Sequence, residues 1–283
     1  MRVLSIQSSV AYGHVGNSAA VFPLQRLGHE VWPVLTVHFS NHTGYGAWRG
    51  PLLPAADVAA VILGIEERGV LGSCDAVLSG YLGDPELAAV VVDAVARVRA
   101  ANPAATYTCD PVMGNAASGC FVRPEIPDLM RGLVVPAADV VTPNQFELGY
   151  LTGTDPETLE QVLGAVDRLR RTGPSVVLVT SVTHPGLPAD ALEMVAVDGQ
   201  GAWAVRTPRL PITANGSGDL TAALFTAHLA ATGRSDEALA RTASSVYGVL
   251  LATWRSGERE LRLVAAQDVI AAPSCEYPVR RLR

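Results

Sequence analysis

Short runs of β-branched and other apolar residues alternate with longer amphipathic stretches along most of this chain. Short apolar runs bounded by polar or turn residues are typical of strands buried in a sheet. The strand candidates are Val3 to Ile6, Val31 to Val37, Ala76 to Ser79, Thr106 to Cys109, Val140 to Thr142 and Val176 to Thr180. Between successive candidates the chain is long enough for a helix.

The stretches between the strand candidates carry helix-start signals. Asn17 and Ser18 can cap a helix that ends before Gly28, and three further stretches have proline at or near the first turn, where proline is favoured. These are Pro54 to Arg68, Pro85 to Ala101 and Pro156 to Arg171. Strands that alternate with helices predict an α/β fold with a doubly wound, mostly parallel sheet flanked by helices on both faces.

The last third of the chain departs from this alternation. Ala191 to Val197 and Gly201 to Val205 predict a hairpin that turns at Asp198-Gly199. Helices are expected after it, from Ser217 to Thr232 and from Asp236 to Trp254. Because no repeat or linker-like stretch interrupts the chain, we expect residues 1–283 to form a single domain.

Polar residues gather at the ends of five apolar strand candidates. They are Gln7-Ser8, Ser79-Gly80-Tyr81, Asp110, Thr142-Pro143-Asn144 and Thr180-Ser181. In open parallel sheets ligands bind beyond the carboxyl ends of the strands, so five such clusters predict one polar crevice. The alternative is that strands end in polar turn residues with no further role.

Composition narrows the function classes. Hydrophobic residues make up 49% and charged residues 17% of the chain, which excludes intrinsic disorder. The net charge of −6, without a basic cluster, argues against nucleic-acid partners. Lys+Arg is 21 and all 21 are arginine, so the chain has no lysine. This excludes pyridoxal-phosphate enzymes, which need a lysine Schiff base, and Walker A loops, which need a lysine for phosphate.

The cysteines and the hydropathy pattern indicate the cellular compartment in which the protein is expected. Cys74, Cys109, Cys120 and Cys275 form no C-x-x-C pair, so a disulfide scaffold or a structural zinc site is not expected. No stretch of eighteen residues is predominantly apolar, and the N-terminus lacks a signal-peptide pattern. We therefore expect a cytoplasmic protein with no membrane partner.

A glycine-rich turn precedes the apolar helix start at Leu220. In Asn215-Gly216-Ser217-Gly218-Asp219 the glycines let the backbone approach a ligand, and the first N–H groups of the helix suit a phosphate. The alternative is a turn with a helix cap, since Asn-Gly favours hairpins and Asp stabilises helix N-termini. A hairpin requires strands on both sides, however, and the following segment has a helical pattern.

With these motifs the chain resembles the pyridoxal kinases of the ribokinase-like superfamily nearly end to end. The G-S-G-D turn is shared across the superfamily, whereas the F-S-N-H-T and D-P-V-M-G segments are far more specific. The matching segments are 5–8, 12–17, Phe39-Ser40-Asn41-His42-Thr43, 79–81, Cys109-Asp110-Pro111-Val112-Met113-Gly114, 142–147 and 216–219. The resemblance implies ATP-dependent phosphorylation of the pyridoxal 5′-hydroxyl by a homodimer.

The resemblance also implies roles for individual residues. Asp219 matches the general base, and Gly216, Ser217 and Gly218 match the anion hole for the phosphoryl group. Positions that hold the vitamer are matched by Ser8, Thr43, Gly44, Tyr81 and Asp219. Positions on the ATP side are matched by Asp110, Thr142, Asn144, Glu147, Thr180, Ser181, Thr207, Pro208, Arg209 and Leu210. Among these, Asp110 and Glu147 match the metal positions, which implies Mg²⁺ and allows a monovalent cation such as K⁺.

Two positions depart from the family pattern. Many bacterial members carry a lysine at the position of Thr180, whereas Thr180-Ser181 is similar to the eukaryotic branch, which uses two hydroxyls there. Asn115 replaces the acidic residue that the eukaryotic branch usually has after M-G. The phosphate site is therefore expected to carry less charge than in either branch, with Mg²⁺ and the helix N-terminus supplying the counter-charge.

Cys120 and the overall activity each leave alternatives. Cys120 is either a small packing residue or, as its resemblance to the bacterial pyridoxal kinases implies, a lid cysteine that can add to the substrate aldehyde. Hydroxymethylpyrimidine kinase is a second enzyme candidate, although it usually has a G-G-A-G-x-Q-A-type stretch where this chain has Gly13-His14-Val15-Gly16-Asn17. A vitamer-binding protein of kinase fold without catalysis is the third candidate.

Overall fold

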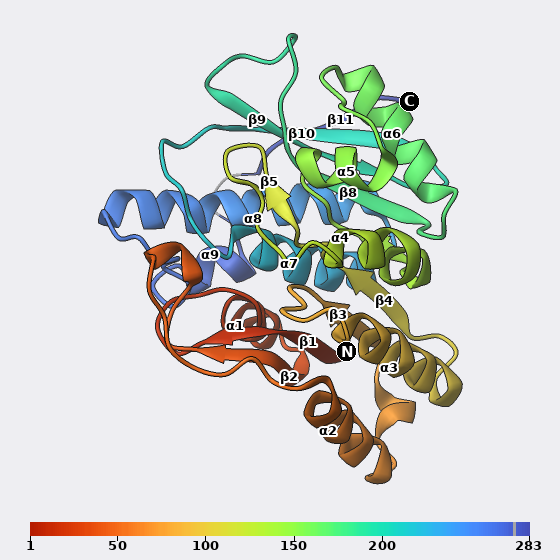
Figure 1. Ribbon diagram of the computed structural model, residues 1–283. Helices are drawn as coiled ribbons and strands as arrows, with labels where there is room; N and C mark the ends of the chain where they lie inside the picture. Colours follow the sequence, from red (N-terminus) through yellow and green to blue (C-terminus); the bar gives the residue numbers. More distant parts are fainter. Residues whose placement is uncertain (274–275) are drawn as a thin grey trace.

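The alternating strands and helices form one mixed sheet, seen in the computed structural model, which describes residues 1–273 and 276–283 (Figure 1). Cys275 lies outside the described residues. Six strands are parallel, namely β2 (Glu30–Phe39), β1 (Arg2–Val10), β3 (Ala76–Ser79), β4 (Thr106–Cys109), β7 (Val140–Val141) and β8 (Val176–Val182). They are continued at the β8 edge by antiparallel β9 (Ala191–Val197), β10 (Ala202–Pro208) and β11 (Val279–Arg281). The strand order β11-β10-β9-β8-β7-β4-β3-β1-β2 agrees with the predicted mostly parallel sheet.

Helices cover both faces of this sheet because successive strand residues point to opposite sides. In β1, Val3 packs in one core cluster and Leu4 in another. The helices on the Val3 side are α1 (Asn17–Arg26), α7 (Ser217–Thr232), α8 (Ser235–Ser256) and α9 (Gln267–Ala271). Those on the Leu4 side are α2 (Ala55–Glu67), α3 (Leu87–Ala101), α4 (Ile126–Leu129), α5 (Gln145–Thr152) and α6 (Leu159–Arg170). No helix in the described part of the chain has both the length and the apolar character needed to span a membrane.

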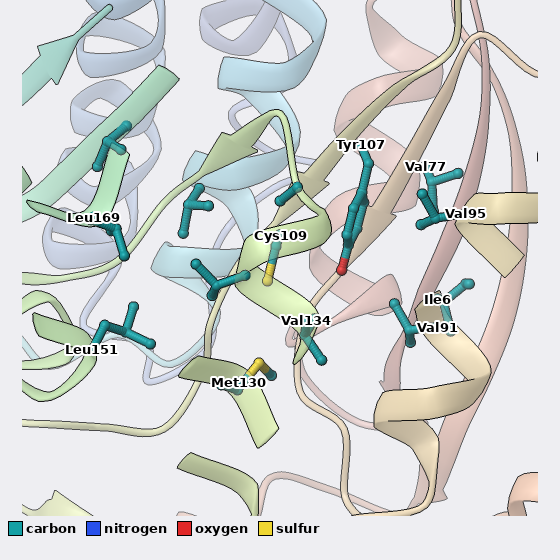
Figure 2. Close-up of a cluster of buried hydrophobic side chains, with 14 of the residues drawn as sticks. Ile6, Val77, Val91, Val95, Tyr107, Cys109, Met130, Val134, Leu151 and Leu169 are labelled. Carbon is teal, nitrogen blue, oxygen red and sulfur yellow. The ribbon is translucent and has the colours of Figure 1, made fainter. Parts of the chain in front are cut away.

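Tyr107 lies in the middle of the larger core cluster, among side chains from β1, α3 and the segment after α4 (Figure 2). Its ring is fully buried, and its hydroxyl is 2.7 Å from the hydroxyl of Ser79 on the neighbouring strand. The pairing matters because a buried hydroxyl without a partner would be costly. This hydrogen bond joins β3 to β4 immediately before their polar ends.

Several predicted elements agree with the structure, and one predicted helix cap does not. The bounds of β3, β4 and α7 agree with the prediction, and the β9–β10 hairpin turns at residues 198–201, where the Asp198 N–H bonds to the Gly201 carbonyl at 3.0 Å. The predicted cap of α1 is wrong. The N-cap is Gly16, and Asn17 is buried, with its amide donating to the carbonyls of Ser5, Gln7 and Val34. Asn17 therefore ties α1 to the sheet rather than capping it.

Candidate active site at the carboxyl edge of the sheet

The polar strand ends lie along one edge of the sheet. The six parallel strands all end there, which brings the segments after β1, β3, β4, β7 and β8 to the same side. Because β10 is antiparallel to β9, and β9 to β8, β10 runs in the same direction as the parallel strands and ends at this edge as well. Thr207 and Pro208 end β10, and Arg209 and Leu210 follow, with the Arg209 N–H donating to the Asp190 carbonyl at 2.7 Å.

The turn before α7 brings backbone N–H groups to this edge. Gly216 has a φ of 83° and is the N-cap of α7, and no side chain caps the helix. The N–H groups of a helix's first turn have no intrahelical acceptors and are free to bind an anion. Asp219 lies in this first turn and is partly exposed. Burial raises the pKa of Asp219, while hydrogen bonding from backbone N–H groups, including that of Gly16, opposes the rise.

Asp110, directly after β4, faces the start of α7. A Cβ atom placed on Gly218 would lie 3.8 Å from Asp110 Oδ2, and Asp110 Oδ1 accepts a hydrogen bond from the Thr142 hydroxyl at 3.1 Å. Asp110 is 4% exposed, and its pKa is raised well above the usual value by burial and then by the negative charges of Glu147 and Asp219. A cation between these carboxylates would relieve that repulsion, and oxygen ligands are those that Mg²⁺ prefers.

Glu147 is a helix cap as well as a buried carboxylate. Asn144 and Glu147 form a reciprocal capping box at the start of α5, with 2.9 Å from the Glu147 N–H to Asn144 Oδ1 and 2.9 Å from the Asn144 N–H to Glu147 Oε2. The other oxygen accepts from the N–H groups of Met113 and Gly114 at 2.9 and 3.3 Å. Burial raises the pKa of Glu147 to about 7, although these backbone donors lower it. No group of three or more His, Cys, Asp or Glu side chains in the described residues is arranged to hold a metal by itself.

A small hairpin follows Met113 and carries two residues that the sequence singled out. Its strands are β5 (Gly114–Asn115) and β6 (Gly119–Cys120). The Asn115 side chain accepts hydrogen bonds from the N–H groups of Ala117 and Ser118, both at 2.9 Å, so it shapes the hairpin turn. Cys120 is exposed, unlike the buried Cys74 and Cys109. Its exposure argues against a packing role.

Thr180 and Ser181 lie at a local irregularity of β8. The register with β9 shifts between Val179 and Val182, and Ser181 has a φ of 56°, the one positive φ of a non-glycine residue in the described part of the chain. Such a conformation costs energy and is concentrated at functional sites. Thr180 pairs with Asn144 through an isolated parallel bridge, and its N–H donates to the Pro143 carbonyl at 2.9 Å, so the Thr180 backbone lies beside the start of α5.

The residues expected to hold the vitamer come from three further segments. Ser8 is 7% exposed and lies against Gly16, where a Cβ atom would be 2.2 Å from the Ser8 carbonyl oxygen. Tyr81 follows β3 and packs on the cluster formed by Val10, Val15, Val37 and Phe39. Thr43 and Gly44 belong to an exposed 3-10 turn, and a Cβ on Gly44 would lie 3.8 Å from Asn215 Nδ2. The 43–45 turn therefore approaches the turn before α7.

The structure adds residues that sequence reasoning missed. Tyr45, the last residue of the 43–45 turn, contacts both Arg259 and Glu260, with 2.7 Å from its hydroxyl to Glu260 Oε1. Tyr45 and Glu260 lie 215 positions apart in the chain, and none of the three residues belongs to a motif with a chemical meaning, so no sequence signal pointed to them.

The fold and the site define a ribokinase-like small-molecule kinase, through the doubly wound sheet, the turn at α7 that suits a phosphate, and the carboxylates beside that turn. Comparisons with known proteins agree with this class. A pyridoxal kinase structure from Leishmania donovani in complex with ADP and pyridoxamine superposes with a TM-score of 0.92 at 29% identity, over 100% of this chain and 99% of that one. The family model described as phosphomethylpyrimidine kinase matches residues 69–263.

Curated relatives show which family within this class the chain belongs to. Pyridoxal kinase PdxY of Leifsonia xyli subsp. xyli is 66% identical over 282 residues and covers 100% of both chains. Pyridoxal kinase PdxY of Rubrobacter xylanophilus is 60% identical, over 100% of this chain and 98% of the relative. The chain belongs to the pyridoxal kinase family.

Proposed function

We propose that this chain transfers the γ-phosphoryl group of ATP to the 5′-hydroxyl of pyridoxal, giving pyridoxal 5′-phosphate and ADP. The observation that carries this proposal is the position of Asp219 in the first turn of α7, beside the buried carboxylate of Asp110. A proton acceptor at an anion-binding helix terminus is what hydroxyl phosphorylation requires.

In the proposed reaction Asp219 accepts the hydroxyl proton as the bond from the vitamer oxygen to the γ-phosphorus forms and the bond to the β-phosphate oxygen breaks. The raised pKa makes Asp219 a stronger proton acceptor than an exposed aspartate, and the base must be ionised to act. The N–H groups of Gly216, Ser217 and Gly218 donate to the phosphoryl oxygens, where negative charge is spread in the transition state.

The remaining polar groups of the edge divide between the two substrates. Ser8, Thr43, Gly44 and Tyr81 hold the pyridine ring and its substituents. Because the chain has no lysine, the hydroxyls of Thr180 and Ser181 take the place of a cationic phosphate ligand. The other residues proposed for the nucleotide are Asp110, Thr142, Asn144 and Glu147 toward the phosphates and Thr207, Pro208, Arg209 and Leu210 toward adenine.

The residues at the edge suit a divalent cation. Asp110 and Glu147 would hold Mg²⁺, which would supply positive charge against the ATP phosphates, and K⁺ is a further candidate cofactor. Glu147 already accepts three backbone hydrogen bonds, which favours contact through a water molecule, whereas Asp110 Oδ2 faces the α7 turn.

Three further properties belong to the proposal. The chain acts as a single kinase domain over residues 1–283 and as a homodimer. It works in the cytoplasm, since the buried free thiols of Cys74 and Cys109 suit a reducing compartment.

Substrate screening tests the activity. Purified protein with Mg-ATP is assayed for ADP release with pyridoxal, pyridoxine, pyridoxamine and hydroxymethylpyrimidine, and pyridoxal binding without ATP is measured by isothermal titration. We expect turnover of pyridoxal. Turnover of hydroxymethylpyrimidine alone would overturn the pyridoxal assignment in favour of the second enzyme candidate. Binding of pyridoxal without any turnover would indicate a vitamer-binding protein.

A further inference from the structure

The segment 42–46, which carries Thr43 and Gly44 of the proposed vitamer site, has little of its own packing. Thr43, Gly44 and Gly46 are exposed. The segment is anchored at its base, where the Ser40 N–H donates to the Arg49 carbonyl at 2.7 Å, and Asn41 donates to the Ala47 carbonyl at 2.9 Å. Within the tip, the N–H groups of Tyr45 and Gly46 donate to the carbonyls of His42 and Thr43, and the Tyr45 ring meets that of Tyr12 edge-on at 6.1 Å. These contacts shape the turn but do not tie it to the turn before α7.

The tip is held from the other end of the chain, by the segment 257–262 after α8. The Arg259 guanidinium donates to the Gly44 carbonyl at 2.7 Å and stacks on the ring of Tyr45, with Cζ 3.7 Å from the ring centre. The Tyr45 hydroxyl donates to Glu260 Oε1 at 2.7 Å. Two adjacent residues therefore bind both the backbone and the aromatic side chain of the segment.

Glu260 also contacts His14, which packs on the turn before α7. Its Oε2 accepts the His14 N–H at 3.0 Å, and this approach needs a glycine before His14, since a Cβ on Gly13 would lie 2.2 Å from Oε2. The carbonyl of His14 in turn lies against Gly216, where a Cβ would be only 1.8 Å away. One carboxylate thus connects the tip of the vitamer segment to the residue that packs on the N-cap of α7.

The hydrogen bond and the charges at the contact of Tyr45 with Glu260 and Arg259 suit a lasting restraint on the segment 42–46. The hydrogen bond to Glu260 is the main cause that raises the pKa of Tyr45 to about 12, as expected for a phenol that donates to a carboxylate. Hydrogen bonds to an ionised acceptor are about twice as strong as neutral ones. The guanidinium adds a cation–π contact on the same ring.

We propose that Arg259 and Glu260 are positioning residues that hold the vitamer segment 42–46 against the turn before α7, so that Thr43 and Gly44 are in place before the vitamer binds. This inference rests on the proposed function. It follows because a segment that is ordered in advance loses less conformational entropy when its ligand arrives. The restraint acts on the vitamer side, since neither residue contacts the proposed nucleotide residues.

Steady-state kinetics of Glu260→Gln and Tyr45→Phe test the proposal. Each removes the charge-assisted hydrogen bond with little change of shape, and we expect the KM for pyridoxal to rise about tenfold, with the KM for ATP unchanged. The double variant should show little more than the rise of Glu260→Gln alone, because Tyr45→Phe removes a hydrogen bond that Glu260→Gln has already weakened. Glu258→Gln is the matched control, since Glu258 is exposed in the same loop and pairs with Arg262 instead.

A second readout does not depend on turnover. Trypsin cleavage after Arg49, an exposed residue at the base of the segment, should be faster in Glu260→Gln than in wild type or Glu258→Gln, as measured by mass spectrometry. Equal rises of both KM values, or cleavage as slow as in the control, would overturn the positioning role. If wild-type protein turns over no vitamer while the cleavage difference is present, the proposed function fails and the restraint stands.

Discussion

The Gly216 backbone lies so close to the carbonyl oxygen of His14 that a Cβ atom on Gly216 would be 1.8 Å from it. Gly216→Ala should therefore displace the turn before α7 as well as strain its positive φ. Because a displacement of about 1 Å in a reaction site can cost roughly 100-fold in rate, we expect kcat to fall by about that factor or more.

Gly233 is the matched control for this variant. It ends the same helix with a φ of 64°, and a Cβ placed there would meet nothing within 4 Å. Gly233→Ala should cost about 1 to 2 kcal/mol of stability through backbone strain alone and leave kcat unchanged. Thermal melting and steady-state kinetics of both variants separate the two effects. Equal kcat values for them would show that the close approach has no catalytic consequence.

Asp219→Asn tests the proposed base. The substitution keeps the volume but removes the negative charge and the proton acceptor, so kcat should fall by about two orders of magnitude or more while the melting temperature changes little. Pyridoxal should still bind. Asp236→Asn is the control, because Asp236 is also an acidic residue in the first turn of a helix, α8. An early-melting Asp219→Asn with normal turnover would show that Asp219 stabilises the start of α7 and is not the base.

A lysine at position 180 tests whether the phosphate site is short of charge. Thr180 adjoins Asn144 at the start of α5, so an ammonium group there would act on the nucleotide side. Thr180→Lys should lower the apparent KM for ATP several-fold and leave that for pyridoxal unchanged. Thr180→Met, of similar length but uncharged, should give no such gain. If both variants leave the ATP dependence as it was, neither an added charge nor the Thr180 hydroxyl affects ATP binding, and the proposed role of Thr180 is wrong.

Cys120 can be tested by absorbance. If its exposed thiol adds to bound pyridoxal, an S–C bond forms at the aldehyde carbon, the thiol proton passes to the carbonyl oxygen, and the aldehyde absorption is lost. Cys120→Ala should then bind pyridoxal with the aldehyde band intact. Cys74→Ala, at a buried site, should give the wild-type spectrum. Identical spectra for wild type and Cys120→Ala would exclude the adduct.

His228 predicts a specific loss of stability in acid. Burial, with help from Arg241 and His29, lowers the pKa of His228 to about 4, and its Nε2 has no hydrogen-bond partner. An unfolded histidine titrates near 6.5, so the folded state resists protonation and stability falls as the pH drops from about 6.5 toward 4. At pH 4.5 the loss from this residue should be about 2 to 3 kcal/mol.

Urea unfolding of His228→Leu at pH 7.5 and pH 4.5 measures this contribution. The variant should lose less stability between the two pH values than wild type by that amount. His38→Gln, at an exposed position, should follow wild type. A His228→Leu variant with the wild-type pH dependence would show that the acid loss arises elsewhere.

Local pattern predicted those elements whose burial is uniform. β3 is short and buried throughout, β4 is buried after its exposed first residue, Thr106, and the sequence bounds of both agree with the structure. β1 continues to Val10, beyond the predicted end at Ile6, because Ser9 and Val10 still pair with β2 although the apolar run has stopped. β11 was missed, since a three-residue strand with two arginines has no strand pattern of its own and is defined by pairing with β10.

The proposed site likewise contains residues that the sequence predicted and residues that it did not. Asp110, Glu147 and Asp219 carry motifs, because their chemistry constrains the neighbouring backbone. Tyr45 and Glu260 meet only through the folded topology, and their contact is made of ordinary residue types. Nothing in a single sequence distinguishes such a pair from two surface side chains.

Because the chain has no lysine, none of its side chains carries a primary amine. An aldehyde that enters or leaves the proposed site at the carboxyl edge of the sheet therefore meets no neighbouring side-chain amine with which to condense into an imine. Amine-reactive reagents would likewise leave every side chain at this edge unmodified.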